Sequence, residues 1–175
     1  MPETIHIDPL FTLRVRTDTP AETRALGQRL GRLLPAGQVI ALRGDLGAGK
    51  TMLTQGIAAG LGVTARVTSP TFTLVNQYQT PDQRELIHID SYRLGEGNAT
   101  AELEAATLGL EDILAEEKAI VVIEWAERVA PLLPLDRLEI ALAYDDQAPT
   151  TRTIVLAALG PISAETLLAL STNHQ

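Results

Sequence analysis

The 175-residue sequence predicts an α/β fold, a three-layer sandwich with a mainly parallel central sheet and an antiparallel hairpin at the sheet edge. Two short apolar runs, at 38–42 and 119–123, are typical of buried parallel strands. Segments with helical periodicity separate such strands along the chain. Near the end, 138–144 and 151–156 alternate apolar and polar residues, which predicts the hairpin.

The first segments of the chain predict a strand followed by a helix. Residues 11–16 alternate apolar and polar side chains, which predicts the strand. Thr19 suits the N-cap of the helix, Pro20 suits its first position, and Glu22 lies where a capping box requires it. One apolar helical face then follows before Pro35 ends the helix: Leu26, Leu30, Leu33 and Leu34.

The later elements continue this alternation. The run 38–42 predicts a strand between turn residues, and 49–61 predicts a helix with leucine and isoleucine on one side. The remaining expectations are strands at 72–78 and 85–90, a helix over 101–117 broken near Gly109, a strand at 119–124, hairpin strands at 138–144 and 151–156, and a helix at 163–170.

Composition excludes several classes of protein. The sequence has no cysteine, which excludes disulfides, thiol chemistry and thiolate metal sites and fits a reducing cytoplasm. Residues 1–12 lack the pattern of a secretory signal, and no apolar run approaches the roughly 20 residues that span a bilayer. We therefore expect a single cytoplasmic domain over residues 1–175, without membrane association, that is a monomer or weak oligomer when alone.

The charge balance disfavours nucleic acid as a direct ligand. Lysine and arginine number 14 against 22 acidic residues, which gives a net charge of -8. Such a surface repels phosphate backbones, so a polyanionic ligand must be held by a local arrangement. Only Lys50 and Lys118 are lysines among the basic residues, which suggests that a retained lysine has a chemical role.

A glycine-rich segment supplies such an arrangement. Residues 44–51 match G-x-x-x-x-G-K-[ST], between the strand at 38–42 and a helix. The glycines permit backbone torsions that turn successive amides toward a phosphate, and the helix N-terminus adds its dipole. Lys50 can bridge the β- and γ-phosphates, and the Thr51 hydroxyl is suited to ligate Mg²⁺. The fold class is accordingly P-loop NTPase-like. A guanine-specific N-K-x-D motif is absent, which favours ATP.

Two carboxylates end strands that follow the loop. Glu124 ends the apolar run 119–123, and Asp90 ends the strand at 85–90. A P-loop site requires an acidic group that holds Mg²⁺ or orients the attacking water, and either residue suits both roles. The alternative for each is a solvated carboxylate at a strand end. His88 is expected to be a structural histidine that is partly buried.

The segment 67–72 is rich in hydroxyl groups and contains a proline that restricts its backbone. Ser69, Pro70 and Thr71 form a candidate switch that orders around a γ-phosphate, although composition alone also fits an ordinary turn. Three of the six aromatic residues lie in or beside these segments: Phe72, Tyr92 and Trp125.

Together these motifs resemble the TsaE family, also called YjeE, of small bacterial ATPases. The resemblance covers about residues 10–157, and the tail at 161–175 matches no motif. The segments that carry it occur in order: Gly44 to Thr51, Ser69 to Val75 (SPTFTLV), His88 to Leu94 (HIDSYRL), Leu108 to Glu111 (LGLE) and Glu124-Trp125.

The resemblance implies a role in threonylcarbamoyladenosine modification of tRNA. A family member hydrolyses ATP while associated with TsaD and TsaB, so tRNA would be met only through these partners. Lys50, Asp90 and Glu124 would be catalytic, with Thr51 and Glu124 as Mg²⁺ ligands. Met52 departs from the small hydroxyl residue common in the family. The nucleotide would contact Asp45, Leu46, Gly47, Ala48, Gly49, Lys50, Thr51, Met52 and Trp125.

Two other functions fit the same loop. A small metabolite kinase would use residues 64–100 as an acceptor pocket with Asp90 as base, although Arg84 and Arg93 are isolated and form no evident lid. A non-catalytic interaction module would use ATP only to order the switch segment. Arg152, in the last expected strand, is a candidate to reach the nucleotide, although an exposed arginine is the preferred interpretation.

Overall fold

The computed structural model describes residues 8–97, 99–145 and 147–172. Most of the N-terminal segment expected to lack a secretory signal, and the last three residues of the tail, therefore lie outside the described residues. The longest helix in the described ranges has 14 residues, and none of those helices could span a bilayer.

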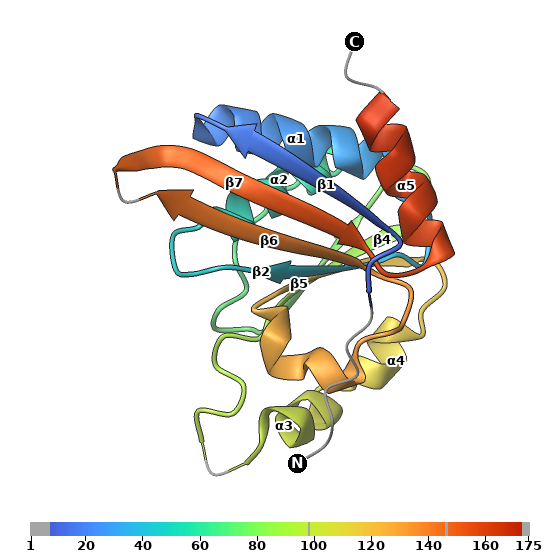
Figure 1. Ribbon diagram of the computed structural model, residues 1–175. Helices are drawn as coiled ribbons and strands as arrows, with labels where there is room; N and C mark the ends of the chain where they lie inside the picture. The colour runs from blue at the N-terminus through green and yellow to red at the C-terminus, as the bar shows by residue number, and fades with distance from the viewer. Residues whose placement is uncertain (1–7, 98, 146, 173–175) are drawn as a thin grey trace.

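A mixed seven-stranded sheet forms the centre of the molecule, with strand order β1-β7-β6-β2-β5-β4-β3 (Figure 1). The four middle strands run parallel to one another, whereas β3, β7 and β1 pair antiparallel with their neighbours. The strands are β1 (Phe11–Thr17), β2 (Val39–Arg43), β3 (Val75–Gln79), β4 (Glu85–Asp90), β5 (Ala119–Glu124), β6 (Leu138–Asp145) and β7 (Ala148–Ala158).

The predicted fold class is confirmed, with one refinement at the edge. The β6–β7 hairpin is present, but β1 pairs outside β7 and forms the edge of the sheet. Since β1 comes first in the chain, short-range patterns contain no signal for this long-range pairing.

Helices cover both faces of the sheet. Helices α1 (Pro20–Leu33), α2 (Lys50–Gly60) and α5 (Pro161–Thr172) lie on one face. On the other face lie α3 (Ala101–Thr107), α4 (Leu110–Leu114) and the 3₁₀ segment η1 (Ala126–Leu132). The break expected near Gly109 is confirmed, because Gly109 has φ 71° and separates α3 from α4.

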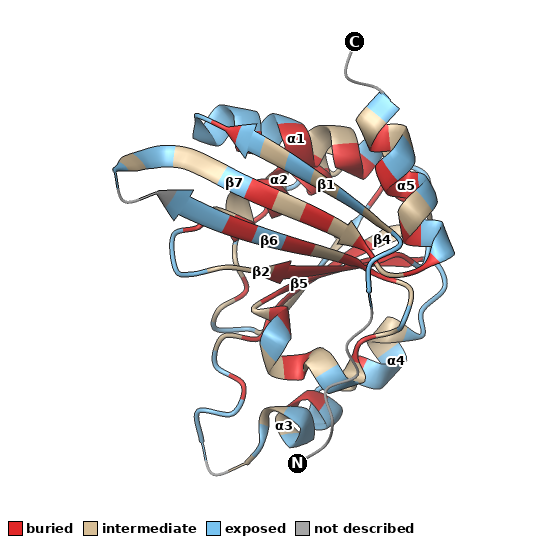
Figure 2. Ribbon diagram, in the orientation of Figure 1, coloured by how far each residue is buried: buried red, intermediate tan, exposed pale blue. Residues whose placement is uncertain are grey.

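The central strands are buried on both faces, as Figure 2 shows for β2 and β5. In β2, Ile40 and Leu42 pack toward α1 and α2, whereas Val39 and Ala41 pack toward the opposite layer. This double burial explains why these strands are continuous apolar runs rather than alternating ones.

The helix expected over 101–117 ends at Leu114, and two other segments differ more from the predictions. The strand expected over 72–78 begins only at Val75, because residues 71–73 form a turn and Leu74 adopts a φ of 65°. The Leu74 amide donates to the Pro70 carbonyl at 2.6 Å, which closes that turn. The segment η1 was not predicted, since Pro131 and its short length hide a helical pattern.

Glycines permit a close approach of α1 and α2. Gly27 and Gly31 of α1 face Gly56 and Gly60 of α2, and a Cβ atom on Gly56 would lie 2.9 Å from the Gly27 Cα. The same Cβ would overlap the Arg24 carbonyl oxygen. The contact fixes α2 against α1, and α2 begins at the glycine-rich loop.

We therefore predict that Gly56→Ala destabilises the protein. Alanine improves helix propensity by about 1 kcal/mol, but overpacking against the α1 backbone costs about 1–3 kcal/mol or more. The net loss is measured by urea unfolding. Gly97→Ala is the control, because its Cβ would meet only the Glu104 carboxylate at 3.5 Å. Equal midpoints for the two variants would contradict the prediction.

Candidate functional site

The glycine-rich loop connects the end of β2 to the start of α2. Gly44 has φ 142°, and a side chain there would overlap the Leu142 carbonyl oxygen of β6. Gly49 is the N-cap of α2 with φ 105°, a conformation that side chains disfavour. The Gly49 carbonyl accepts the amide of Leu53 at 3.0 Å, so the helix starts directly at the loop.

The Lys50 side chain folds back over this loop. Its Nζ donates to the carbonyl oxygens of Gly44 at 2.5 Å and Asp45 at 2.9 Å. The same ammonium lies 3.8 Å from the centre of the Trp125 ring, a cation–π contact. Lys50 is only 5% exposed.

Burial lowers the pKa of Lys50 from its ordinary value of 10.5, and nearby carboxylates, Glu124 foremost, oppose that shift. The ammonium therefore sits in a site that hydrates it poorly. An anionic ligand would supply the counter-charge that favours its protonated form.

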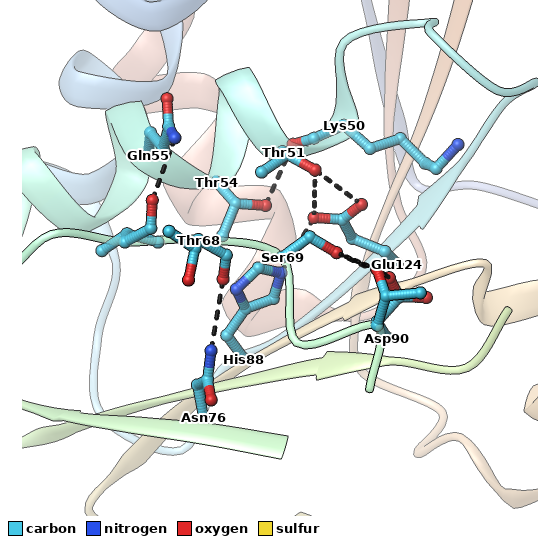
Figure 3. Close-up of polar contacts among 12 residues, drawn as sticks. Lys50, Thr51, Thr54, Gln55, Thr68, Ser69, Asn76, His88, Asp90 and Glu124 are labelled. Atoms are coloured by element: carbon cyan, nitrogen blue, oxygen red, sulfur yellow. Dashed lines mark hydrogen bonds and ion pairs between the residues drawn. The ribbon is translucent and has the colours of Figure 1, made fainter. Parts of the chain in front are cut away.

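Thr51 and Glu124 are in direct contact (Figure 3). The Thr51 hydroxyl lies 3.0 and 3.1 Å from the two carboxylate oxygens of Glu124, to which it donates. Glu124 is buried at the end of β5, and Thr51 belongs to the first turn of α2. A hydroxyl and a carboxylate are oxygen ligands of the kind that Mg²⁺ prefers.

His88 supports the Glu124 carboxylate from β4. Its Nε2 lies 2.8 Å from Glu124 Oε1, and its ring is fully buried, more than the partial burial that we expected. His88 Nδ1 has no hydrogen-bond partner among the described residues. The tautomer with its proton on Nε2 leaves no buried N–H unpaired, and this makes His88 a donor to Glu124.

Asp90 binds the predicted switch segment. Its Oδ2 accepts from the Ser69 hydroxyl at 2.7 Å and from the Thr71 hydroxyl at 3.0 Å. Its Oδ1 accepts from the Tyr92 amide at 3.0 Å. The two carboxylates thus have different partners: Glu124 faces the start of α2, whereas Asp90 faces the 69–71 segment.

Trp125 occupies a strained backbone position beside the site. Its φ of 59° and ψ of 39° are left-handed, which costs a non-glycine residue about 1–3 kcal/mol. The Ser91 hydroxyl donates to the carbonyls of Glu124 at 2.8 Å and Trp125 at 2.9 Å, which stabilises this turn. The centre of the Tyr92 ring lies 4.9 Å from the centre of the Trp125 ring.

These groups surround one open cavity of about 390 Å³. Most predicted site residues line it, but Asp45, Ala48 and Pro70 do not, and the Ala48 side chain is buried in the core. Tyr92 lines the cavity and was not predicted to bind a cofactor; its place two residues after Asp90 was the available signal. The lining residues are Leu46, Gly47, Gly49, Lys50, Thr51, Met52, Ser69, Thr71, Asp90, Tyr92, Glu124 and Trp125.

One expectation about the surroundings is wrong. Arg152 is half-buried rather than exposed, and its guanidinium donates to carbonyl oxygens of the glycine-rich loop. Sequence patterns could not reveal this contact, because 104 residues separate Arg152 from Ala48.

The oxygen atoms of Thr51 and Glu124 fit a cation that takes only some of its ligands from the protein. Among residues 8–97, 99–145 and 147–172, no group of three His, Cys, Asp or Glu side chains could hold a metal ion. Mg²⁺ commonly takes one or two protein ligands and completes its shell with phosphate oxygens and water. Thr51 with Glu124 matches that pattern.

The fold and this loop define a protein of the P-loop NTPase-like class. The family model "Threonylcarbamoyl adenosine biosynthesis protein TsaE" matches residues 17–154. The chain therefore belongs to the TsaE family, whose members act in threonylcarbamoyladenosine biosynthesis.

Relatives agree with this assignment. The chain is 39% identical over 145 residues to the tRNA threonylcarbamoyladenosine biosynthesis protein TsaE of Bacillus subtilis, covering 82% of this chain and 86% of the relative. It is 45% identical over 126 residues to the protein of that name from a Nostoc species, covering 71% and 74%. The crystal structure of Bacillus subtilis YdiB matches with a TM-score of 0.76 and 32% identity, covering 94% and 97%.

We predict that His88→Leu destabilises the protein without nucleotide. The change removes a donor from a buried carboxylate while nearly preserving volume, and such a loss costs about 1–3 kcal/mol. His88→Gln, which keeps an amide donor, is expected to lose less. Urea unfolding measures both. An unchanged or higher midpoint for His88→Leu would show that His88 does not stabilise Glu124.

Proposed function

We propose that this chain binds ATP with Mg²⁺ at the cavity and hydrolyses it in the tRNA threonylcarbamoyladenosine pathway. The observation that carries the proposal is the convergence of four groups on one cavity: the glycine-rich loop, the Lys50 ammonium, the Thr51–Glu124 pair and Asp90. Family membership supports the pathway.

The phosphates would bind to the loop amides and to Lys50. In this role the ammonium exchanges the carbonyl oxygens of Gly44 and Asp45 for phosphate oxygens. The low exposure of Lys50 supports a strong interaction, because less water competes with the phosphate. Trp125, whose ring contacts the ammonium, would then stay beside the bound nucleotide.

Thr51 and Glu124 would hold the magnesium ion. Bound Mg²⁺ supplies charge neutralisation of the phosphate oxygens during transfer. His88 fixes the Glu124 carboxylate by its hydrogen bond, so this ligand is oriented before the ion binds.

Asp90 would orient the attacking water. It is buried at the end of β4, lies opposite Glu124 in the strand register, and already accepts two hydroxyl hydrogen bonds from the switch segment. A carboxylate so placed links water orientation to the position of Ser69 and Thr71, which supports the switch role of this segment.

A protein partner would complete the function. We propose the TsaD–TsaB complex in the cytoplasm as this partner, with tRNA held only by the partner because the chain is acidic. Two large apolar side chains are exposed here and are suited to such a contact: Leu46, which lines the cavity, at 76%, and Phe72, which follows the cavity-lining Thr71, at 89%. Hydrolysis by the isolated chain should accordingly be slow.

We predict that Lys50→Ala abolishes tight ATP binding. The variant removes the one cation placed in the cavity by the loop, and ATP titration calorimetry with Mg²⁺ measures the loss. Lys118→Ala is the matched control, since Lys118 is exposed next to the start of β5, outside the cavity lining. Wild-type affinity in Lys50→Ala would overturn the assignment of the site.

We further predict that Asp90→Asn retains ATP binding but slows hydrolysis about 100-fold or more, the range for loss of a carboxylate that orients the water and accepts its proton. Single-turnover assays with and without TsaD–TsaB measure the effect, with the exposed Asp112→Asn as control. If modification activity survives the full loss of hydrolysis, the chain is an ATP-dependent interaction module instead. A metabolite phosphorylated at catalytic rates would favour a kinase.

A further inference from the structure

Arg152 of β7 belongs to none of the motifs of the site, yet it contacts the glycine-rich loop. We propose that Arg152 is a positioning residue for nucleotide binding, which holds the loop in the form that presents its amides to a triphosphate. This inference rests on the proposed function and adds a residue to it.

The contact involves most of the guanidinium. Arg152 Nε donates to the Ala48 carbonyl at 2.8 Å, and Nη2 donates to the Gly47 carbonyl at 3.1 Å. The third nitrogen, Nη1, donates to the carbonyls of Pro149 at 2.6 Å and Thr151 at 2.9 Å. One side chain thus joins the loop to the β6–β7 hairpin through backbone groups alone.

These hydrogen bonds set the direction of the loop amides. In a planar trans peptide the C=O of one residue and the N–H of the next point in opposite directions. The Ala48 carbonyl points at Arg152, so the Gly49 N–H points away from it, and Gly49 lines the cavity. The Ala48 N–H is directed within the loop, to the Asp45 carbonyl at 3.1 Å.

Two cations therefore hold the loop carbonyls in the structure. Lys50 donates to the carbonyl oxygens of Gly44 and Asp45, and Arg152 donates to those of Gly47 and Ala48. In the proposed function Lys50 leaves its carbonyls to bind phosphate. Arg152 is anchored on β7, so its hydrogen bonds to the Gly47 and Ala48 carbonyls can persist when ATP binds.

The type of residue matters for this role. A guanidinium offers several N–H donors in a fixed plane and reaches loop and hairpin at once, whereas a lysine offers one compact ammonium. Tyr144 of β6 lies 5.4 Å from the guanidinium and restrains it further. The positive charge behind the loop also favours the polyphosphate.

The test compares Arg152→Ala, Arg152→Lys and Arg14→Ala by ATP titration with Mg²⁺. Arg14 is an exposed arginine of β1. Arg152 pairs with Thr17 and therefore shares its face of the sheet, whereas Arg14, three residues before Thr17, points to the opposite face because side chains alternate along a strand. We expect ATP affinity to fall at least about tenfold in Arg152→Ala, less in Arg152→Lys and not in Arg14→Ala. Turnover at saturating ATP should change less than KM.

A second readout separates positioning from general stability. Methylguanidine at millimolar concentration should restore part of the ATP affinity of Arg152→Ala, and the Ala48 amide, which donates to the Asp45 carbonyl, should exchange hydrogen faster in this variant without nucleotide. Wild-type affinity in Arg152→Ala, or in Arg152→Lys if the alanine variant does not fold, overturns the inference. An unchanged Ala48 exchange rate also overturns it. Failure of the wild-type chain to bind ATP instead overturns the proposed function.

Discussion

The parallel pairing of β2, β5 and β4 is the constraint on which the site depends. Its register sets Leu42, the residue before the end of β2, opposite Glu124, and Glu124 opposite Asp90. The carboxyl ends of all three strands therefore lie side by side at one end of the sheet, where ligands of open α/β sheets bind. A shift of one residue in either ladder would turn a carboxylate to the opposite face.

The buried charged groups at the carboxyl ends of these strands are stabilised by specific partners. Lys50, Asp90 and Glu124 are all buried, in a chain whose net charge is -8. Each has several hydrogen-bond donors or acceptors, from backbone carbonyls, hydroxyls or the His88 ring. Burying a charge without such partners would cost several kcal/mol. The same groups are available to exchange these contacts for those of a ligand.

Close contacts between backbone segments, more than side-chain packing, fix the positions of the glycine-rich loop and α2. Gly56 lets α2 lie against the α1 backbone, and Gly44 lets the loop pass the β6 carbonyl of Leu142. Arg152 then holds the loop carbonyls from β7. Three separate regions of the chain thus determine one loop, so that variants far from the cavity are expected to act on it.

The sequence by itself determined the glycine-rich loop, the order of most elements and the strand-end carboxylates, because these depend on local spacing and apolar periodicity. It left the partners of Asp90 and Glu124 open, and it missed the late start of β3. Only tertiary structure brought Glu124 to Thr51 and Arg152 to Ala48. The first of these contacts spans 73 positions of the sequence and the second spans 104. Sheet register and side-chain direction decide which residues meet over such separations, and a local sequence pattern contains neither.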